Sequence, residues 1–316
     1  MNINTDEFVW VQKYRPSTIN EIILTDSLKK IFNGIVKEGK CPNLLLSGTS
    51  GVGKTTVAYA LAKELNADLM YINASSESSI DVIRTKVLQF ASTISFSGGS
   101  KITLLDEFDG MSPNAMNALK GFLEEFSSNH SFIFTSNSLH KIIEPLQSRC
   151  QVIDFGVSNA DKAKLAAQFF KRVTQILEYE KIEYEKPIVA EIVQEFFPDF
   201  RKCLNALQKY SQSGKIDSGI LSSFSSDNFN VLIKSLKDKK FTDMRRWLVQ
   251  NNDIDPNKLF REFYDTASDK MEAKSIPALI LHLGEYQYKS AFSLDQEINT
   301  AAFLTEVMTD PMIVWK

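Results

Sequence analysis

Eight consecutive residues, Gly48 to Thr55, combine glycines with a lysine and a hydroxyl side chain. They read GTSGVGKT and fit the pattern G-x-x-x-x-G-K-[ST] in full. Glycines let the backbone curl so that its N–H groups point at phosphate oxygens. The pattern places Lys54 to neutralise the β- and γ-phosphates of a nucleotide and Thr55 to hold Mg²⁺. An ordinary glycine-rich turn would need six fixed features to coincide, so we predict a triphosphate site.

Two adjacent carboxylates, Asp106 and Glu107, follow the apolar run at 102–105. Parallel sheets bind ligands beyond the carboxyl ends of their strands. Asp106 is then placed to bind the Mg²⁺ held by Thr55, and Glu107 to polarise a water for in-line attack on the γ-phosphate. Alone, the pair would be read as a solvated strand end. Together with the phosphate motif, it favours hydrolysis.

Three further polar residues carry weaker signals. Asn137 ends another apolar run and could bond the γ-phosphate or the attacking water, although a lone Asn at a strand end is usually a turn residue. Arg149 could form an ordinary surface ion pair, or it could be a finger that reaches a neighbouring subunit's nucleotide. Arg201, at the expected start of a helix, could reach back to the phosphates.

These side chains need a scaffold that brings strand ends together. Apolar runs at 43–47, 69–73, 101–105, 131–135 and 151–155 alternate with helical patterns such as 55–65 and 114–126. This alternation predicts a parallel sheet with helices on both faces. After Phe155 the strand pattern ends, and residues 159–214 indicate three helices with breaks near Pro187 and Pro198. A serine-rich linker at 211–226 and further helices follow. We predict an α/β nucleotide-binding domain over 1–156 and helical domains over 157–222 and 223–316.

Composition excludes several protein classes. The chain of 316 residues is 43% hydrophobic and 24% charged, which is typical of a soluble globular protein. No run approaches the roughly 18 apolar residues that span a bilayer, and no secretory signal is visible. The net charge of −3 disfavours a globally basic nucleic-acid binder but allows a local basic patch. Three scattered cysteines without a C-x-x-C pair support neither a zinc site nor a disulfide framework, and a reducing cytoplasm is expected.

Four sequence strings together point to a known family. They are QKYRP at 12–16, the phosphate motif, DEFD at 106–109 and KIIEPLQSRC at 141–150. With them the chain resembles the AAA+ ATPase subunits of sliding-clamp loaders, whose signature includes the S-R-C ending. It is similar to replication factor C small subunits and especially to the large ATPase subunits of T-even-type phage clamp loaders. The string FPDFRK at 197–202 resembles the phage version of the second sensor.

The resemblance implies a P-loop AAA+ module with a helical lid, followed by an all-α collar. It implies that ATP, bound with Mg²⁺, opens and loads the polymerase processivity clamp at primer–template junctions. Hydrolysis stimulated by the clamp and DNA then releases it. The implied partners are further copies of this chain and a distinct small loader subunit in a five-membered ring, the sliding clamp and primer–template DNA, with no membrane. The implied location is the cytoplasm, that of the host cell if the protein is viral.

The resemblance also implies roles for single residues. The catalytic residues would be Lys54, Asp106, Glu107 and Asn137, with Arg149 acting in trans, and Thr55 and Asp106 would hold Mg²⁺. The residues that would bind the nucleotide are Val11, Gln12, Lys13, Tyr14, Ile23, Gly51, Val52, Gly53, Lys54, Thr55, Thr56 and Arg201. Arg84, Lys86 and Lys120 are the candidates for gripping the DNA backbone.

Other functions remain open at this point. Another ring-forming AAA+ motor, such as a protein unfoldase or a branch-migration helicase, would normally lack the S-R-C ending. A non-hydrolysing structural subunit would not need the intact Lys54, Thr55, Asp106 and Glu107. A small-molecule kinase would need neither the two additional arginines nor the helical C-terminal third.

Overall fold

The computed structural model describes residues 7–76, 80–93, 100–125, 130–212, 214–217, 226–251 and 256–316. The chain divides into two compact units, Met1–Ile216 and Asp217–Lys316. The predicted boundary between residues 156 and 157 falls inside the first unit, and the division into three domains stays a prediction.

A sheet of five parallel strands forms the centre of the first unit. The strands are β1 (Leu44–Ser47), β2 (Asp68–Asn73), β3 (Lys101–Asp106), β4 (His130–Ser136) and β5 (Gln151–Asp154), in the order β2-β3-β4-β1-β5. The central strands β1 and β4 are buried along their whole length, and each carries an unbroken apolar run, Leu44–Leu46 and Phe132–Phe134, rather than an alternating pattern. The predicted parallel sheet is confirmed, and the carboxyl ends of its central strands meet at one edge.

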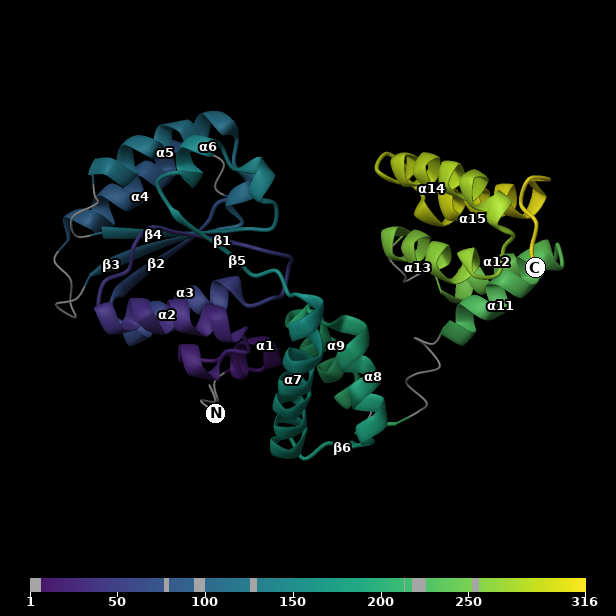
Figure 1. The fold of residues 1–316 in the computed structure, drawn as a ribbon, viewed down its shortest axis with the longest axis horizontal. Coiled ribbons are helices and arrows are strands. Elements are labelled where there is room, and N and C mark those ends of the chain that lie inside the picture. Colours follow the sequence, from purple (N-terminus) through teal and green to yellow (C-terminus); the bar gives the residue numbers. More distant parts are fainter. Residues whose placement is uncertain are drawn as a thin grey trace. The chain divides into compact units, whose positions relative to one another are not determined.

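Helices cover both faces of this sheet (Figure 1). One face carries α2 (Asp26–Glu38) and α3 (Lys54–Glu64), whose apolar side chains share a core with β1. The other carries α4 (Ile80–Ser92), α5 (Pro113–Glu125) and α6 (Glu144–Gln147), packed on Phe132 and Phe134 of β4. The short 3-10 helices η2 (Phe108–Gly110) and η3 (Leu139–Lys141) follow β3 and β4. The central strands of the sheet are therefore covered by helices on both faces, whereas the edge strands β2 and β5 are partly exposed.

Three helices complete the first unit after the sheet, as predicted. They are α7 (Asn159–Tyr179), α8 (Lys186–Phe196) and α9 (Phe200–Ser211). Pro187 lies in the first turn of α8, where its missing N–H is not needed, and Pro198 separates α8 from α9. One expectation was wrong, because β6 (Glu183–Tyr184) and β7 (Lys215–Ile216) form a short parallel pair after Phe155. Strands of two residues are too short to give a periodic signal.

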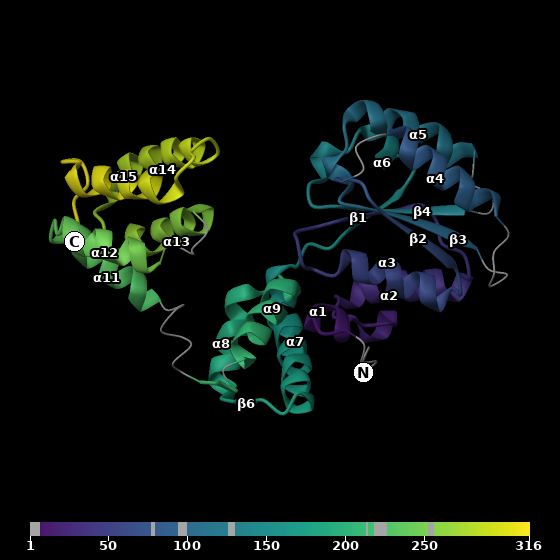
Figure 2. The ribbon, with the colours of Figure 1, turned by 180° about the vertical axis from the view of Figure 1, so that it is seen from behind.

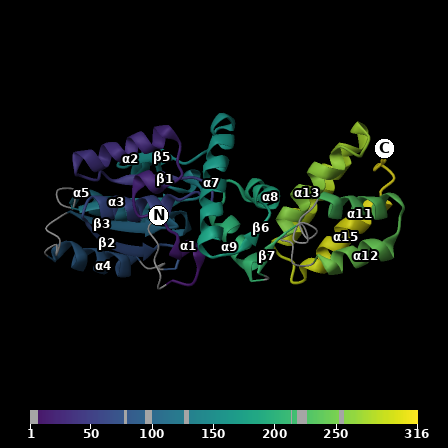
Figure 3. The same cartoon turned by 90° about the horizontal axis from the view of Figure 1, so that it is seen from below.

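The N-terminal segment is attached to two of these helices, α7 and α9. It contains α1 (Trp10–Lys13), followed by η1 (Ile19–Glu21). The backbone N–H of Trp10 donates to Gln208 Oε1 of α9 at 2.9 Å, and Lys13 Nζ pairs with Glu180 Oε1 at the end of α7 at 2.7 Å. The hydroxyl of Tyr14 donates to the same Glu180 oxygen. Accordingly, α1 lies against α7 and α9 (Figure 3).

The second unit is helical (Figure 2). Its described helices are α11 (Ser226–Lys237), α12 (Phe241–Gln250), α13 (Pro256–Ser268), η4 (Ala273–Ser275), α14 (Ile276–Ser290) and α15 (Gln296–Thr309). Phe260 and Phe263 of α13 meet Phe303 of α15 edge to face, with ring centroids 5.1 and 5.4 Å apart. The helices predicted for this region are thus present around an aromatic core. Across the described parts of both units, every helix is too short or too polar to cross a membrane.

Candidate active site

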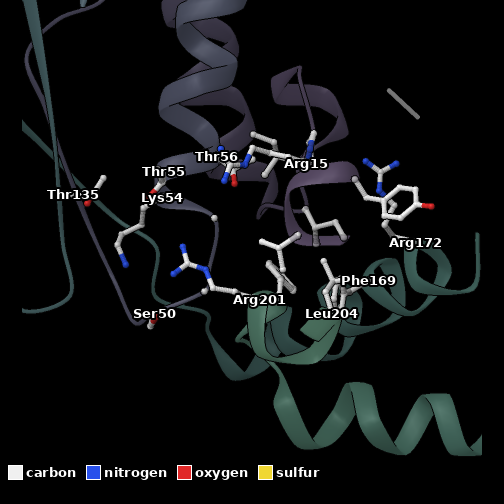
Figure 4. A pocket seen from close by; sticks show the side chains of 18 of the residues that line it. Arg15, Ser50, Lys54, Thr55, Thr56, Thr135, Phe169, Arg172, Arg201 and Leu204 are labelled. Atoms are coloured by element: carbon white, nitrogen blue, oxygen red, sulfur yellow. The ribbon is translucent and has the colours of Figure 1, made fainter. Parts of the chain in front are cut away.

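One pocket of the first unit collects most of the chemistry-bearing residues (Figure 4). The loop after β1 supplies Ser50 and the run from Gly53 to Thr56, together with Gly51. The ends of β3 and β4 supply Asp106, Glu107, Thr135 and Asn137, and α9 supplies Arg201. Strand ends that the sequence separates by tens of residues are adjacent because the strands run parallel.

The loop 48–53 forms a concave turn in front of α3. Gly51 has φ +76°, and a Cβ at this position would collide with the Asp199 side chain. Gly53, with φ +100°, occupies the N-cap position of α3, and the helix begins at Lys54. Both positions favour glycine, since other residues rarely adopt these conformations. The unpaired N–H groups of the first turn of α3 make this end of the helix suitable for an anion.

Lys54 is 7% exposed and lies within hydrogen-bond distance of three oxygens. Its Nζ donates to the carbonyls of Gly48 and Thr49 at 2.7 and 2.8 Å and to Asn137 Oδ1 at 2.8 Å. Burial lowers the pKa of Lys54 to about 8, although the negative charge of Asp106 opposes this shift. The structure thus joins Asn137 to the phosphate loop through Lys54.

Hydroxyl groups hold the two acidic residues in place. Thr55 Oγ1 donates to Asp106 Oδ1 at 2.8 Å, and Thr135 Oγ1 donates to the same oxygen at 2.5 Å. Thr135 Oγ1 also accepts the backbone N–H of Glu107 at 3.1 Å. On the other side, Tyr71 Oη donates to Asp106 Oδ2 at 3.3 Å. Thr135 therefore fixes the Asp106 carboxylate and the backbone of Glu107.

The hydroxyl and carboxylate oxygens of Thr55 and Asp106 suit Mg²⁺. Among the residues that the structure describes, no three His, Cys, Asp or Glu side chains are grouped to bind a metal. Mg²⁺ commonly uses one or two carboxylates together with substrate phosphates and water, so this donor set fits it.

Glu107 has a left-handed backbone with φ +54°, which is unusual outside glycine. Its carboxylate is turned toward the end of β2, where Ser75 Oγ lies 2.7 Å from Glu107 Oε2. The same hydroxyl lies 2.7 Å from Asn73 Oδ1, which also accepts the Ser75 N–H at 2.9 Å. The polar end of β2 thus holds the second acid.

The three-helix part of the unit forms the opposite wall of the pocket. The Phe200 N–H at the start of α9 donates to the Gly51 carbonyl at 3.2 Å. Arg201 lies beside Lys54 in the pocket (Figure 4), and its positive charge contributes to the lowered pKa of Lys54, after burial. Away from the phosphate loop, the lining becomes largely apolar and includes Val11, Ile23, Phe169, Ile176 and Leu204.

Three residues expected to bind the nucleotide do not line the pocket. Lys13 pairs with Glu180 instead, and Val52 is buried in the core beneath the loop. Gln12 lines a separate depression with Tyr59. The other residues in that set all line the pocket, Tyr14 among them.

The cations expected to act on other molecules also lie outside the pocket. Arg149 is exposed, and its Nη1 donates to the Pro145 carbonyl of α6 at 2.8 Å. Arg84 and Lys86 are exposed on α4, and the half-buried Lys120 lies on α5. The structure therefore separates these four cations from the chain's own pocket.

Sequence analysis missed Thr135, Ser75 and Tyr71. The first two lie within two residues of a strand's carboxyl end, so listing every hydroxyl near those ends would have found them. Tyr71 also carries a hydroxyl and lies two residues before the end of β2, so the same search would have included it.

Known proteins with similar sequences decide the family. Residues 44–156 match the ATPase family associated with various cellular activities (AAA), and residues 161–222 match the lid domain of the sliding-clamp-loader large subunit. The large subunit from Enterobacteria phage T4 is 42% identical over 78% of both chains, and that from Escherichia phage RB69 is 35% identical over 100% of both. The chain belongs to the sliding-clamp-loader large-subunit family.

More distant relatives agree with this assignment. A replication factor C small subunit from Saccharolobus solfataricus is 32% identical over 97% of this chain and 96% of its own length. The structure of the Thermotoga maritima RuvB Holliday junction branch migration motor has a TM-score of 0.54 at 15% identity, covering 72% of this chain and 80% of RuvB. At that identity the likeness shows the fold alone. Membership of the clamp-loader family confirms the predicted AAA+ fold and shows a nucleotide-binding, ATP-hydrolysing clamp-loader subunit.

Proposed function

We propose that this chain binds ATP with Mg²⁺ in the pocket and uses the nucleotide to open a polymerase clamp and load it at primer–template junctions. The observation that carries the proposal is that Lys54, Thr55, Asp106 and Glu107 line one pocket. Two threonine hydroxyls also order the acids there. A protein that only held nucleotide would not need this arrangement of acids.

Each group has a role that follows from its place. The loop from Gly51 to Thr56 holds the phosphates, and Lys54 neutralises their charge. Thr55 and Asp106 hold Mg²⁺, which withdraws charge from the phosphate oxygens when it is bound. Glu107 accepts the proton of the attacking water.

The remaining pocket residues position the nucleotide. Asn137, already bonded to Lys54, orients the water or the γ-phosphate. Val11, Tyr14 and Ile23 pack on the adenine, and Arg201 contacts the phosphates from the lid. Nucleotide binding is thereby coupled to the position of the lid relative to the sheet.

We assign Arg149 to the nucleotide of a neighbouring subunit. It is exposed and lies outside its own pocket, just after the end of α6. In a five-membered ring of these chains and a distinct small subunit, each Arg149 would complete the next site. ATP then favours the tight ring that grips the clamp and DNA, and loss of the γ-phosphate favours release. Arg84, Lys86 and Lys120 contact the DNA backbone.

Steady-state ATP turnover tests the proposal. Turnover is measured for the assembled loader alone, with the cognate clamp, with primer–template DNA and with both. We expect the largest rate with both, and a smaller response to blunt duplex DNA. Equal rates in all four conditions would contradict the clamp-loading function. Closed six-membered rings in native mass measurements would favour another AAA+ motor.

A further inference from the structure

One wall of the nucleotide pocket belongs to residues 8–16, the N-terminal wall. The residues of this wall that line the pocket are Val11, Tyr14, Arg15 and Pro16, and Arg15 is labelled in Figure 4. The helix of the wall, α1, has only four residues, and its N-cap residue makes no side-chain cap hydrogen bond. A helix this short is not stable by itself in water. The position of the N-terminal wall therefore depends on its contacts with the rest of the unit.

Two residues of the lid helices hold this wall, one on α9 and one at the end of α7. The first is Gln208 of α9. Its Oε1 accepts the backbone N–H of Trp10, and its Nε2 donates to the Phe8 carbonyl, both at 2.9 Å. Trp10 is only 5% exposed, and α1 lies against α9. Part of the wall is thus attached to the lid through its backbone.

The second residue is Glu180, the C-cap of α7, which receives hydrogen bonds from two neighbours on the wall. Lys13 Nζ donates to Glu180 Oε1 at 2.7 Å, and the Tyr14 hydroxyl donates to the same oxygen. Burial by itself would raise the pKa of the Glu180 carboxyl, but these two hydrogen bonds hold the pKa below its ordinary value. The carboxylate is therefore ionised at neutral pH and binds both donors.

Tyr14 connects Glu180 to the nucleotide pocket. It is 3% exposed, and its ring lies edge to face with that of Tyr179, with centroids 6.1 Å apart. The same residue lines the pocket, whereas Glu180 lines a separate depression. Because Glu180 holds the hydroxyl of Tyr14, the carboxylate fixes where this part of the wall stands without touching the pocket itself.

We infer that Glu180 is a positioning residue for ATP, which holds Lys13 and Tyr14 to the lid and so keeps the N-terminal wall in the conformation that binds the nucleoside. This inference rests on the proposed function, because it places ATP in this pocket. Without Glu180 the wall would sample other conformations, and the apparent ATP affinity falls with the fraction of molecules that are competent to bind. The hydrolytic acids lie at the carboxyl ends of the strands, so the chemical step should be unaffected.

The magnitude follows from the two hydrogen bonds that would be lost. A hydrogen bond to a charged group corresponds to about a ten- to hundredfold change in an equilibrium constant. Since Gln208 still holds the other end of α1, only part of that change should reach the nucleotide. We expect a loss of about three- to tenfold in ATP affinity.

The test uses three measurements. They are Mg²⁺-dependent ATP binding to the full-length protein, amide hydrogen exchange of the peptide that covers residues 10–15, and ATP turnover of the assembled loader. Glu180→Ala removes the carboxylate, and Glu180→Gln keeps an acceptor without the charge. Glu178→Ala is the matched control, since Glu178 is an exposed glutamate of α7 whose carboxylate accepts from Tyr184 at 3.2 Å. Tyr14→Phe removes only the hydroxyl that reaches Glu180.

Glu180→Ala should bind ATP about three- to tenfold more weakly, exchange faster at residues 10–15 and keep its kcat at saturating ATP. Glu180→Gln should lie between Glu180→Ala and the wild type, and Glu178→Ala should behave as the wild type. Tyr14→Phe should weaken ATP binding in the wild type but add little in Glu180→Ala, because the two residues act through one contact.

Unchanged ATP affinity or unchanged exchange in Glu180→Ala would overturn the positioning role. An equal loss in Glu178→Ala, or a fall in kcat that matches the fall in affinity, would also overturn it, because either would indicate damage to the lid as a whole. If Glu180→Ala does not fold, Tyr14→Phe decides in its place, and an ATP affinity equal to that of the wild type refutes the inference. Failure of the wild type itself to bind ATP would instead overturn the proposed function.

Discussion

Replacing Thr135 by Val should damage catalysis more than stability alone can explain. Thr135 is 2% exposed, and its hydroxyl donates to the Asp106 carboxylate and accepts the backbone N–H of Glu107. Valine keeps the branched shape and the strand preference of threonine. The substitution removes a hydrogen bond to the Asp106 carboxylate, worth about 1.5–3 kcal/mol, and leaves the Glu107 N–H unpaired, at about 1–3 kcal/mol. Because Thr55 and Tyr71 still contact Asp106, we expect a total near the lower end, about 3 kcal/mol.

If the loss of about 3 kcal/mol raises the activation free energy of hydrolysis, because the acids are no longer held in place, kcat drops by roughly two orders of magnitude. The assay is phosphate release at saturating ATP with clamp and primed DNA, paired with denaturant unfolding of the same protein. Thr103→Val is the matched control, since Thr103 is 0% exposed on β3 and its hydroxyl pairs with His130 at 2.9 Å. It should lose about 1 kcal/mol of stability and keep its kcat.

Thr135→Ser retains the hydroxyl and should retain most of the activity. The reasoning would be refuted if Thr135→Val and Thr103→Val showed the same kcat, because the Thr135 hydroxyl would then act only on stability.

Three more substitutions test other parts of the site and its scaffold. Glu107→Gln should keep the ATP affinity, measured by equilibrium binding, but abolish ATP turnover and leave the loader bound to clamp and DNA. Turnover within tenfold of the wild type would show that Glu107 is not the proton acceptor. Ser75→Ala should release the Glu107 carboxylate and raise turnover without DNA, whereas an unchanged basal rate would show that this contact restrains nothing. Burial lowers the pKa of His130 to about 4, and the positive charge of Lys101 adds to this shift. Between about pH 6.5 and 4 the unfolded chain therefore binds more protons than the folded one, so the free energy of unfolding falls as the pH falls through that range. His130→Gln should flatten this fall in denaturant titrations, and an unchanged pH slope would contradict the assignment.

The sheet was predictable because its strands are buried on both faces. Apolar runs such as those of β1 and β4 had no other plausible place, and the actual strands start or end within one residue of them. The order β2-β3-β4-β1-β5 was not predictable from these runs, since a run indicates a strand but not which other strand lies beside it.

The parts of the candidate site that lie close together in the sequence were predictable. Glycine spacing located the phosphate loop, and adjacent carboxylates after an apolar run located Asp106 and Glu107. Thr135 could not be found in this way, because a threonine in a strand equally suits packing. Arg172 was not singled out in the sequence, because only the fold brings it to a pocket whose loop is more than a hundred residues earlier in the chain.

Contacts between segments that are far apart in the sequence could not be predicted either, because they depend on the fold. Lys13 was assigned to the nucleotide with its neighbours, but its partner Glu180 lies 167 positions further along. A salt bridge at that separation depends on how α1 packs against α7, and neither helix shows in its own pattern which surface the other will cover.

Complementation between two inactive variants tests the central claim most directly. Lys54→Ala destroys the site of a subunit but leaves its Arg149, while Arg149→Ala leaves the site and removes the arginine that it lends. Turnover is measured for loaders assembled from each variant alone and from both together, with clamp and primed DNA. The account predicts little activity from either alone and clear recovery in the mixture, because some boundaries join an intact site to an intact arginine. A mixture as inactive as its parts, or full activity of Arg149→Ala alone, would contradict a site shared between subunits.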